Sequence, residues 1–133
     1  MAVATTAVLS LDCAEPEQLA EFYATVFGAE ITPVTSLDRI DIVAPGGTRM
    51  SFLRDHGYAP PSWPRPDDSQ QAHLELLVDD MDAAERQVVD LGARPLDTKD
   101  NGGPNDVRLY SDPAGHPFRL RLATPPEEVI RGQ

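Results

Sequence analysis

Two arginines near the end of the chain are spaced so that they could bind an anion. In the run from Phe118 to Leu122, apolar residues alternate with Arg119 and Arg121. Successive side chains of a strand point to opposite faces of a sheet, so both guanidinium groups should share one face. A guanidinium keeps its charge and pairs with carboxylate, enolate or phenolate oxygens. We therefore expect this strand to offer a positive binding surface to a small ligand.

A tight turn is predicted immediately before this strand. In Asp112-Pro113-Ala114-Gly115, proline restricts φ and glycine can adopt a positive φ. This combination is typical of a β-turn, which would lead directly into the arginine-bearing strand.

Other polar residues fall at alternate positions of predicted strands and could face the same ligand. His73 and Glu75 alternate within an apolar run over 72–78. A histidine can accept or donate a proton near neutral pH, and a nearby carboxylate can take part in that transfer. With Arg119 they form the candidate catalytic set. The candidate ligand-binding residues are Ser10, Asp12, Arg49, Ser51, Trp63 and Arg121.

The elements that position these residues occur twice in the same order. The first half is predicted as strand, helix and three strands over 4–11, 16–27, 30–34, 39–44 and 48–54. The second half repeats this order over 72–78, 79–91, 93–96, 107–110 and 118–122. The segment 20–29 also aligns with 84–93 by residue type, so the chain contains an internal repeat of about sixty residues.

The repeat predicts an α+β fold built from two tandem βαβββ modules. Two such modules side by side would form a curved, mixed eight-stranded sheet around a concave cavity, with the helices on its outer face. We expect one domain over 1–133, with module one over about 4–54, a proline-rich linker over 55–71, module two over about 72–123 and a C-terminal tail over 124–133. Trp63 would either cover the mouth of the cavity or anchor the linker.

Composition narrows the class of partner. Eleven basic residues against 22 acidic ones give a net charge of −11, which would repel nucleic acid and an anionic membrane surface. Cys13 is the only cysteine, which excludes a disulfide framework and the spacing of zinc-ribbon or iron–sulfur sites. The sequence shows no basic and apolar leader and no run of about 20 apolar residues. We therefore expect a soluble, cytoplasmic protein that binds a small molecule.

Four short motifs extend over nearly the whole chain. They are Leu-Ala-x-Phe-Tyr-x-x-x-Phe-Gly, His-Leu-x-Leu-x-Val-Asp-Asp, Leu-Gly-Ala and Asp-Pro-x-Gly-His-Pro-Phe. Together they resemble the vicinal oxygen chelate superfamily, which includes glyoxalase I, extradiol dioxygenases, and bleomycin and fosfomycin resistance proteins. Gly-His-Pro-Phe and the linker motif Pro-Pro-x-Trp-Pro are similar to an actinobacterial glyoxalase-like subgroup. The resemblance implies the two-module fold and a homodimer.

The resemblance also implies four metal-ligand positions, on the first and last strands of each module. They fall at Val8 (Leu9 with a one-residue slip), Ser51, His73 and Arg119. Valine and leucine cannot bind a cation, serine is a weak ligand, and a guanidinium cannot lose its proton. A divalent ion needs three or four nitrogen or oxygen donors, so we expect no metal and no other cofactor.

These replacements predict a function without a metal ion. Arg119 would place a fixed positive charge at a metal position, so the chain is expected to bind or sequester a small anionic or planar amphiphilic molecule, as drug-resistance relatives do. The alternative is a metal-independent isomerase, epimerase or cyclase, in which His73 and Glu75 or Asp12 move protons and Arg119 stabilises an anion. A metal-dependent lyase or dioxygenase is the third possibility. The sequence leaves open whether the protein is an enzyme.

A purely structural interpretation competes with each of these roles. Arg119 could pair with Glu75, or Arg121 with Asp12, across strands, and such ion pairs would fill the cavity. His73 could be a half-buried histidine whose hydrogen bonds are satisfied within the protein. The two interpretations differ in whether the hydrogen-bond donors of these side chains are already used within the protein.

Overall fold

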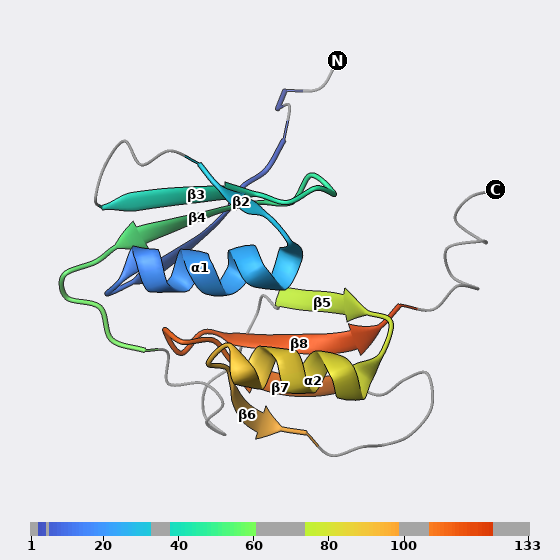
Figure 1. The fold of residues 1–133 in the computed structure, drawn as a ribbon. Helices are drawn as coiled ribbons and strands as arrows, with labels where there is room; N and C mark the ends of the chain where they lie inside the picture. Colours follow the sequence, from blue (N-terminus) through green and yellow to red (C-terminus); the bar gives the residue numbers. More distant parts are fainter. Residues whose placement is uncertain (1–2, 5, 33–37, 61–73, 99–106, 124–133) are drawn as a thin grey trace. The chain divides into compact units, whose positions relative to one another are not determined.

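The computed structural model describes residues 3–4, 6–32, 38–60, 74–98 and 107–123. The first module contains β1 (Leu9–Cys13), α1 (Pro16–Phe27), β2 (Glu30–Ile31), β3 (Arg39–Val43) and β4 (Arg49–Arg54). The second contains β5 (Leu74–Val78), α2 (Met81–Asp90), β6 (Arg94–Asp97), β7 (Val107–Ser111) and β8 (Pro117–Leu122). The same order of elements therefore occurs twice (Figure 1), which confirms the α+β class and the two modules.

The eight strands form two four-stranded sheets, one in each module. Their strand orders are β1-β4-β3-β2 and β5-β8-β7-β6. In each sheet the first and last strands of the module pair in parallel, and the other neighbours are antiparallel. The chain divides into two compact units, 1–61 with 113–115 and 62–112 with 116–133. The equivalent pairing in the two sheets shows that the internal repeat extends to the backbone.

The sequence sets both ends of α1. Pro16 occupies the first turn, where a backbone N–H would have no partner within the helix. The helix ends at Gly28, which has a φ of 64°. Beyond it, the Ala29 N–H donates to the Ala24 carbonyl at 2.8 Å and closes the last turn. The chain thus leaves the helix within one residue and enters β2.

The core of the first unit lies between α1 and the sheet. Leu19, Phe22 and Tyr23 are buried on the helix, which packs on β3 and β4. On β4, Met50 and Phe52 are buried at alternate positions, as expected for one covered face. The Tyr23 and Phe52 rings stack with their centroids 5.7 Å apart. Because these apolar side chains use the helix-covered face, the intervening residues of β4 are directed to the open face.

The helix α2 has the same ending but a different beginning. Asp80 caps its N-terminus, where Oδ1 accepts a hydrogen bond from the Ala83 N–H at 3.1 Å. At the other end, the Ala93 N–H donates to the Val88 carbonyl at 2.9 Å. This bond is equivalent to the one from Ala29 to Ala24 that closes α1. Neither α1 nor α2, the helices of the described residues, is long and apolar enough to cross a membrane.

A buried polar cluster joins α2 to its sheet. The Arg108 side chain is 5% exposed and donates to Asp82 Oδ1 at 3.0 Å and to Glu85 Oε2 at 3.1 Å. The Tyr110 hydroxyl donates to Glu85 Oε1 at 2.7 Å. Burial raises the pKa of Tyr110 above its ordinary value, and the hydrogen bond to Glu85 raises it further. Tyr110 therefore remains a protonated donor. This cluster was not foreseen from the sequence.

The first strand differs from its predicted bounds. It runs over Leu9–Cys13 and not over 4–11. The prediction was wrong because it treated Asp12 as a strand terminator, whereas pairing with β4 continues as far as Cys13 opposite Arg54. Cys13 itself is 1% exposed, and its thiol donates to the Leu53 carbonyl at 3.6 Å. The exposed polar Asp12 is thus a strand residue next to the buried Cys13.

Candidate functional site

Two arginines flank one carboxylate on the open face of the second sheet. Glu75 on β5 is the register partner of Arg119 on β8, and Arg121 lies two residues further along β8. Arg121 Nε donates to Glu75 Oε1 at 3.1 Å, whereas Arg119 Nη1 lies 4.0 Å from Glu75 Oε2. Both arginines therefore lie on one face of the sheet, as their alternation predicts.

The two arginines differ in how their hydrogen-bonding capacity is used. Arg121 forms a charge-assisted hydrogen bond with Glu75. Arg119 Nη1 forms a cross-strand ion pair with the same carboxylate at 4.0 Å, as the structural interpretation predicts, but the contact is too long for a hydrogen bond. Within the described part of the chain, Arg119 donates no hydrogen bond, and its side chain is 32% exposed. Its guanidinium group therefore has donors available for an anionic ligand.

The open face of the first sheet carries a different polar cluster. Ser51 is 1% exposed, and its hydroxyl donates to Asp41 Oδ1 at 2.6 Å. Arg39 Nε donates to the same carboxylate oxygen at 3.1 Å. The Ser51 hydroxyl lowers the pKa of Asp41; burial opposes this shift, and Arg39 adds to it. Asp41 is therefore an ionised carboxylate whose one oxygen accepts two hydrogen bonds.

Arg39 and Asp41 were not among the predicted site residues. They alternate in the run over 39–44, so the sequence indicates that they share one face of a strand. It does not indicate which residue lies opposite, because that depends on the antiparallel register. In the structure the register partner of Asp41 is Ser51, which brings the carboxylate next to a predicted site residue.

The remaining predicted residues have varied positions. Ser10 is the register partner of Ser51, and Asp12 follows two residues later on the same face of β1. These two side chains and Arg49, at the start of β4, are exposed. His73 and Trp63 lie outside the described residues, so their roles stay predictions. The cavity expected between the modules also stays a prediction.

The residues at the implied metal-ligand positions show whether a cation could be coordinated there. Val8 is an exposed apolar residue, the Ser51 hydroxyl already donates to Asp41, and Arg119 is a cation. Across the ranges that the structure describes, no group of three or more histidine, cysteine, aspartate or glutamate side chains gathers in a way that could hold a metal ion. The donor set at Val8, Ser51 and Arg119 does not fit a divalent cation.

The family to which the sequence belongs follows from a match over most of its length. Residues 8–121 match the model of the glyoxalase-like domain. The chain belongs to this glyoxalase-like family. The match begins before β1 and ends within β8, so it includes both modules and both polar faces. A comparison with curated proteins finds no relative.

Solved structures of this superfamily share the fold. A variant of the fosfomycin resistance protein FosX from Listeria monocytogenes, solved with Mn(II) and 1S,2S-dihydroxypropylphosphonic acid, is similar with a TM-score of 0.68, 13% identity and full coverage of both chains at 100%. FosX from Mesorhizobium loti has a TM-score of 0.64 and 16% identity, over 98% of this chain and 100% of that one. A glyoxalase/bleomycin resistance protein/dioxygenase family enzyme from Burkholderia phytofirmans has a TM-score of 0.67 and 14% identity, over 88% and 97%.

These similarities confirm the resemblance to the vicinal oxygen chelate superfamily. Identities of 13% to 16% show a common fold and do not assign a reaction to this glyoxalase-like protein. The actinobacterial subgroup stays a prediction. A function for this chain must therefore be argued from its own side chains.

Proposed function

We propose that this glyoxalase-like protein binds a small organic anion, with Arg119 as the principal contact and without a metal ion at the family's usual position. The observation that carries the proposal is the difference between the two arginines of β8. Arg121 is hydrogen-bonded to Glu75, while Arg119 is 4.0 Å from that carboxylate and partly exposed. An arginine with available donors on an open sheet face is suited to a carboxylate or phosphonate, which it can bind through two parallel hydrogen bonds.

Glu75 has a supporting role in this proposal. Its carboxylate lies near two positive charges, and it holds Arg121 at hydrogen-bonding distance. An arriving anion would compete with Glu75 for Arg119 only across the longer 4.0 Å contact. The net positive charge of the three side chains is one, so a singly charged anion would neutralise the group. A phosphonate is a relevant probe because FosX was solved with a phosphonic acid.

The absence of a metal in the proposed mechanism rests on side-chain chemistry. Arg119 would repel a cation, and the Ser51 hydroxyl donates its hydrogen bond to Asp41. A guanidinium can supply the fixed positive charge that a metal ion would supply to a bound oxyanion. The isomerase, epimerase or cyclase alternative requires His73, and no contact among the described residues favours it.

Calorimetric titration of EDTA-treated protein tests the anion site. Fosfomycin and benzoate are suitable probes, because one is a small phosphonate and the other a planar carboxylate. We expect at least one to bind, and Arg119→Ala to weaken that binding by about tenfold or more through loss of charge-assisted hydrogen bonds. The matched control is Arg86→Ala, which removes an exposed arginine from α2. Equal affinity of the Arg119 variant and the wild type would contradict the proposal.

Elemental analysis tests the metal-independent part separately. We expect protein purified without added metal to contain much less than one equivalent of manganese, zinc, nickel or iron. One equivalent of any of these metals, removable by chelation together with probe binding, would show that the family's metal chemistry persists. The resemblance also predicts a homodimer, which sedimentation equilibrium would detect.

A further inference from the structure

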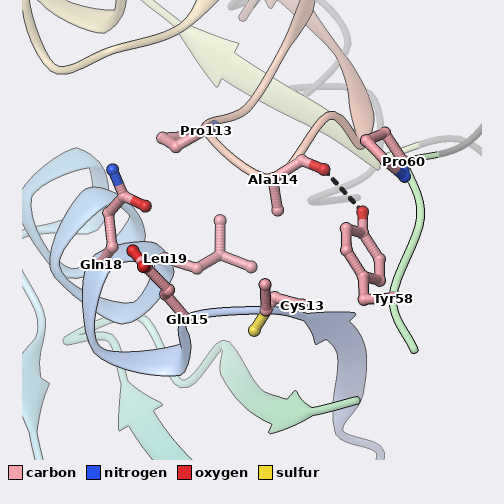
Figure 2. Close-up of a pocket in the computed structure, with 9 residues that line it drawn as sticks. Cys13, Glu15, Gln18, Leu19, Tyr58, Pro60, Pro113 and Ala114 are labelled. Atoms are coloured by element: carbon pink, nitrogen blue, oxygen red, sulfur yellow. Dashed lines mark hydrogen bonds between the residues drawn. The ribbon is translucent and has the colours of Figure 1, made fainter. Parts of the chain in front are cut away.

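A separate cavity lies beside the start of α1 in the first unit. Its volume is about 280 Å³, and all of its lining residues belong to the first unit. Leu19 contributes to its floor, and Tyr58, Pro60 and Pro113 contribute to its walls (Figure 2). These side chains make the lining mainly apolar. The cavity is therefore suited to the apolar part of a small molecule.

The walls of this cavity are held in place by specific contacts. The Tyr58 hydroxyl donates to the Ala114 carbonyl at 2.6 Å (Figure 2). Next to it, a Cβ atom added to Gly115 would lie only 2.8 Å from Pro60 Cβ, so the turn passes close to the proline. Leu19, in the floor, is 1% exposed and fixed within the core. A site whose walls are already ordered has less ordering entropy to lose when a ligand binds.

One side of the cavity is polar. Glu15 and Gln18 lie next to each other there, across from Tyr58 (Figure 2). Neither side chain forms a hydrogen bond or ion pair with another described residue, and the Glu15 side chain does not cap the helix. A carboxylate and an amide at the edge of an apolar cavity can accept hydrogen bonds from an ammonium group.

The charges around this polar side favour a cation. Glu15 and Gln18 also line an adjoining recess that contains Glu17, Glu21 and Arg54. The single positive charge of that recess is already engaged, because Arg54 Nη1 donates to the Ala14 carbonyl at 2.7 Å and Nε donates to Asp38 at 3.2 Å. Three carboxylates against one arginine leave a net charge of −2 beside the head group. This outweighs the positive end of the α1 dipole, which is equivalent to roughly half an elementary charge.

We propose that this cavity binds a small amphiphilic amine, with its apolar body between Leu19 and Pro113 and its ammonium group beside Glu15 and Gln18. A cavity of about 150 Å³ can hold benzene. The present volume of about 280 Å³ therefore accommodates one aromatic ring with a short alkyl chain. The charge preference is opposite to that of the Arg119 surface, and the two sites share no residue.

Three probes that share a phenyl ring on a short alkyl chain test the proposal, namely phenethylamine, 2-phenylethanol and 3-phenylpropionate. They are titrated into ¹⁵N-labelled full-length protein and followed by two-dimensional NMR. We expect phenethylamine to shift the amide signals of 13–15, 17–19, 57–59 and 114–115. It should bind about two- to fivefold more tightly than the alcohol because of a partly exposed charge pair. The propionate should bind more weakly than the alcohol.

Two kinds of variant locate the binding site. Glu15→Gln should reduce the phenethylamine affinity to that of the alcohol, whereas Glu30→Gln, which removes an exposed carboxylate from β2, should leave it unchanged. Ala114→Leu should abolish binding of all three probes by filling the cavity. Ala14→Leu fills the same cavity from an exposed position, so it serves if the first variant unfolds.

The outcomes distinguish this site from the proposed anion site. Signal shifts confined to the cavity, with the preference for the amine removed by Glu15→Gln, would support the proposal. Shifts elsewhere, no shifts at 10 mM probe, or equal affinities for amine and alcohol would overturn it. Arg119→Ala is expected to leave phenethylamine binding unchanged, so failure of the amine site and failure of the anion site give different results.

Discussion

The cluster around Arg108 makes the sharpest prediction about stability. Arg108 is 5% exposed and binds two carboxylates of α2, Asp82 and Glu85. Arg108→Ala would remove the only cation of this cluster and leave Glu85 partly buried beside a cavity. Breaking a buried ion pair from one side typically costs 3–5 kcal/mol. Because the Asp82 side chain is 72% exposed and well hydrated, we expect the lower end, about 3 kcal/mol.

Urea unfolding followed by circular dichroism measures this change. A destabilisation of about 3 kcal/mol should lower the transition midpoint without changing the m-value, and should lower the melting temperature by roughly 10 °C for a chain of this size. Arg86→Ala is the matched control, because it removes an exposed arginine from the same helix. We expect a change below about 0.5 kcal/mol for that control.

A double variant tests whether the unpaired charge is the cause. Replacing Arg108 by methionine and Glu85 by leucine together removes both charges and keeps most of the volume. Such replacements of a buried pair are often neutral, so the double variant should be more stable than Arg108→Ala. A decrease in the free energy of unfolding below about 1 kcal/mol for Arg108→Ala would refute the view that this ion-pair cluster stabilises the packing of α2 on its sheet. A double variant that is less stable than the single one would refute it as well.

Three further changes test other contacts. Gly115→Ala should lower the free energy of unfolding by about 1–3 kcal/mol, because φ is 94° there and a Cβ atom would lie 2.8 Å from Pro60; an unchanged urea midpoint would contradict this. Tyr58→Phe should cost about 1 kcal/mol through the lost hydrogen bond to the turn, measured in the same way. Asp41 has a lowered pKa, so its contribution exists above the unfolded value near 3.8 and is lost as the pH falls through the lower folded value. The stability difference between wild type and Asp41→Asn should therefore be constant above about pH 5 and shrink below pH 3.8; a difference that persists to about pH 2 would count against the Ser51 hydrogen bond as its source.

Much of the fold could be predicted because its local signals agree. Apolar periodicity located both helices, and glycines 28 and 92 marked where they stop. Proline and glycine at 113 and 115 predicted the turn before β8, and Gly115 has the expected positive φ. These signals act within a few residues, so one sequence contains them in full.

The candidate site was harder to predict, because it depends on contacts between distant segments. The alternation of Arg119 and Arg121 indicated that they share a face, but only the structure shows that Arg121, and not Arg119, binds Glu75 closely. Asp41 was missed because its partner Ser51 is set by strand register. The cavity at α1 was missed because its wall combines the helix with Tyr58 and with the turn residues Pro113 and Ala114. Sequence spacing does not encode such long-range packing.

The two modules use equivalent backbone positions for opposite chemistry. In the first sheet, Ser51 lies between Ser10 on the parallel strand and Asp41 on the antiparallel one. In the second, Arg119 lies between Glu75 and Leu109 in the same arrangement. Because a one-residue slip would expose the buried residues that flank each position, packing against the helices holds this register.

The side chains on the open faces do not pack against the helices. A residue there contacts neighbouring strands, so a change in its charge leaves the packing between helix and sheet in place. This explains how the same fold can carry an acidic, hydrogen-bonded centre in one module and an arginine with available donors in the other. It also predicts that Arg119→Ala will alter anion binding while leaving the unfolding midpoint nearly unchanged. Substitution of the adjacent buried Leu120 by alanine should instead lower the free energy of unfolding by about 2–5 kcal/mol and leave the affinity of the folded protein for the anion unchanged.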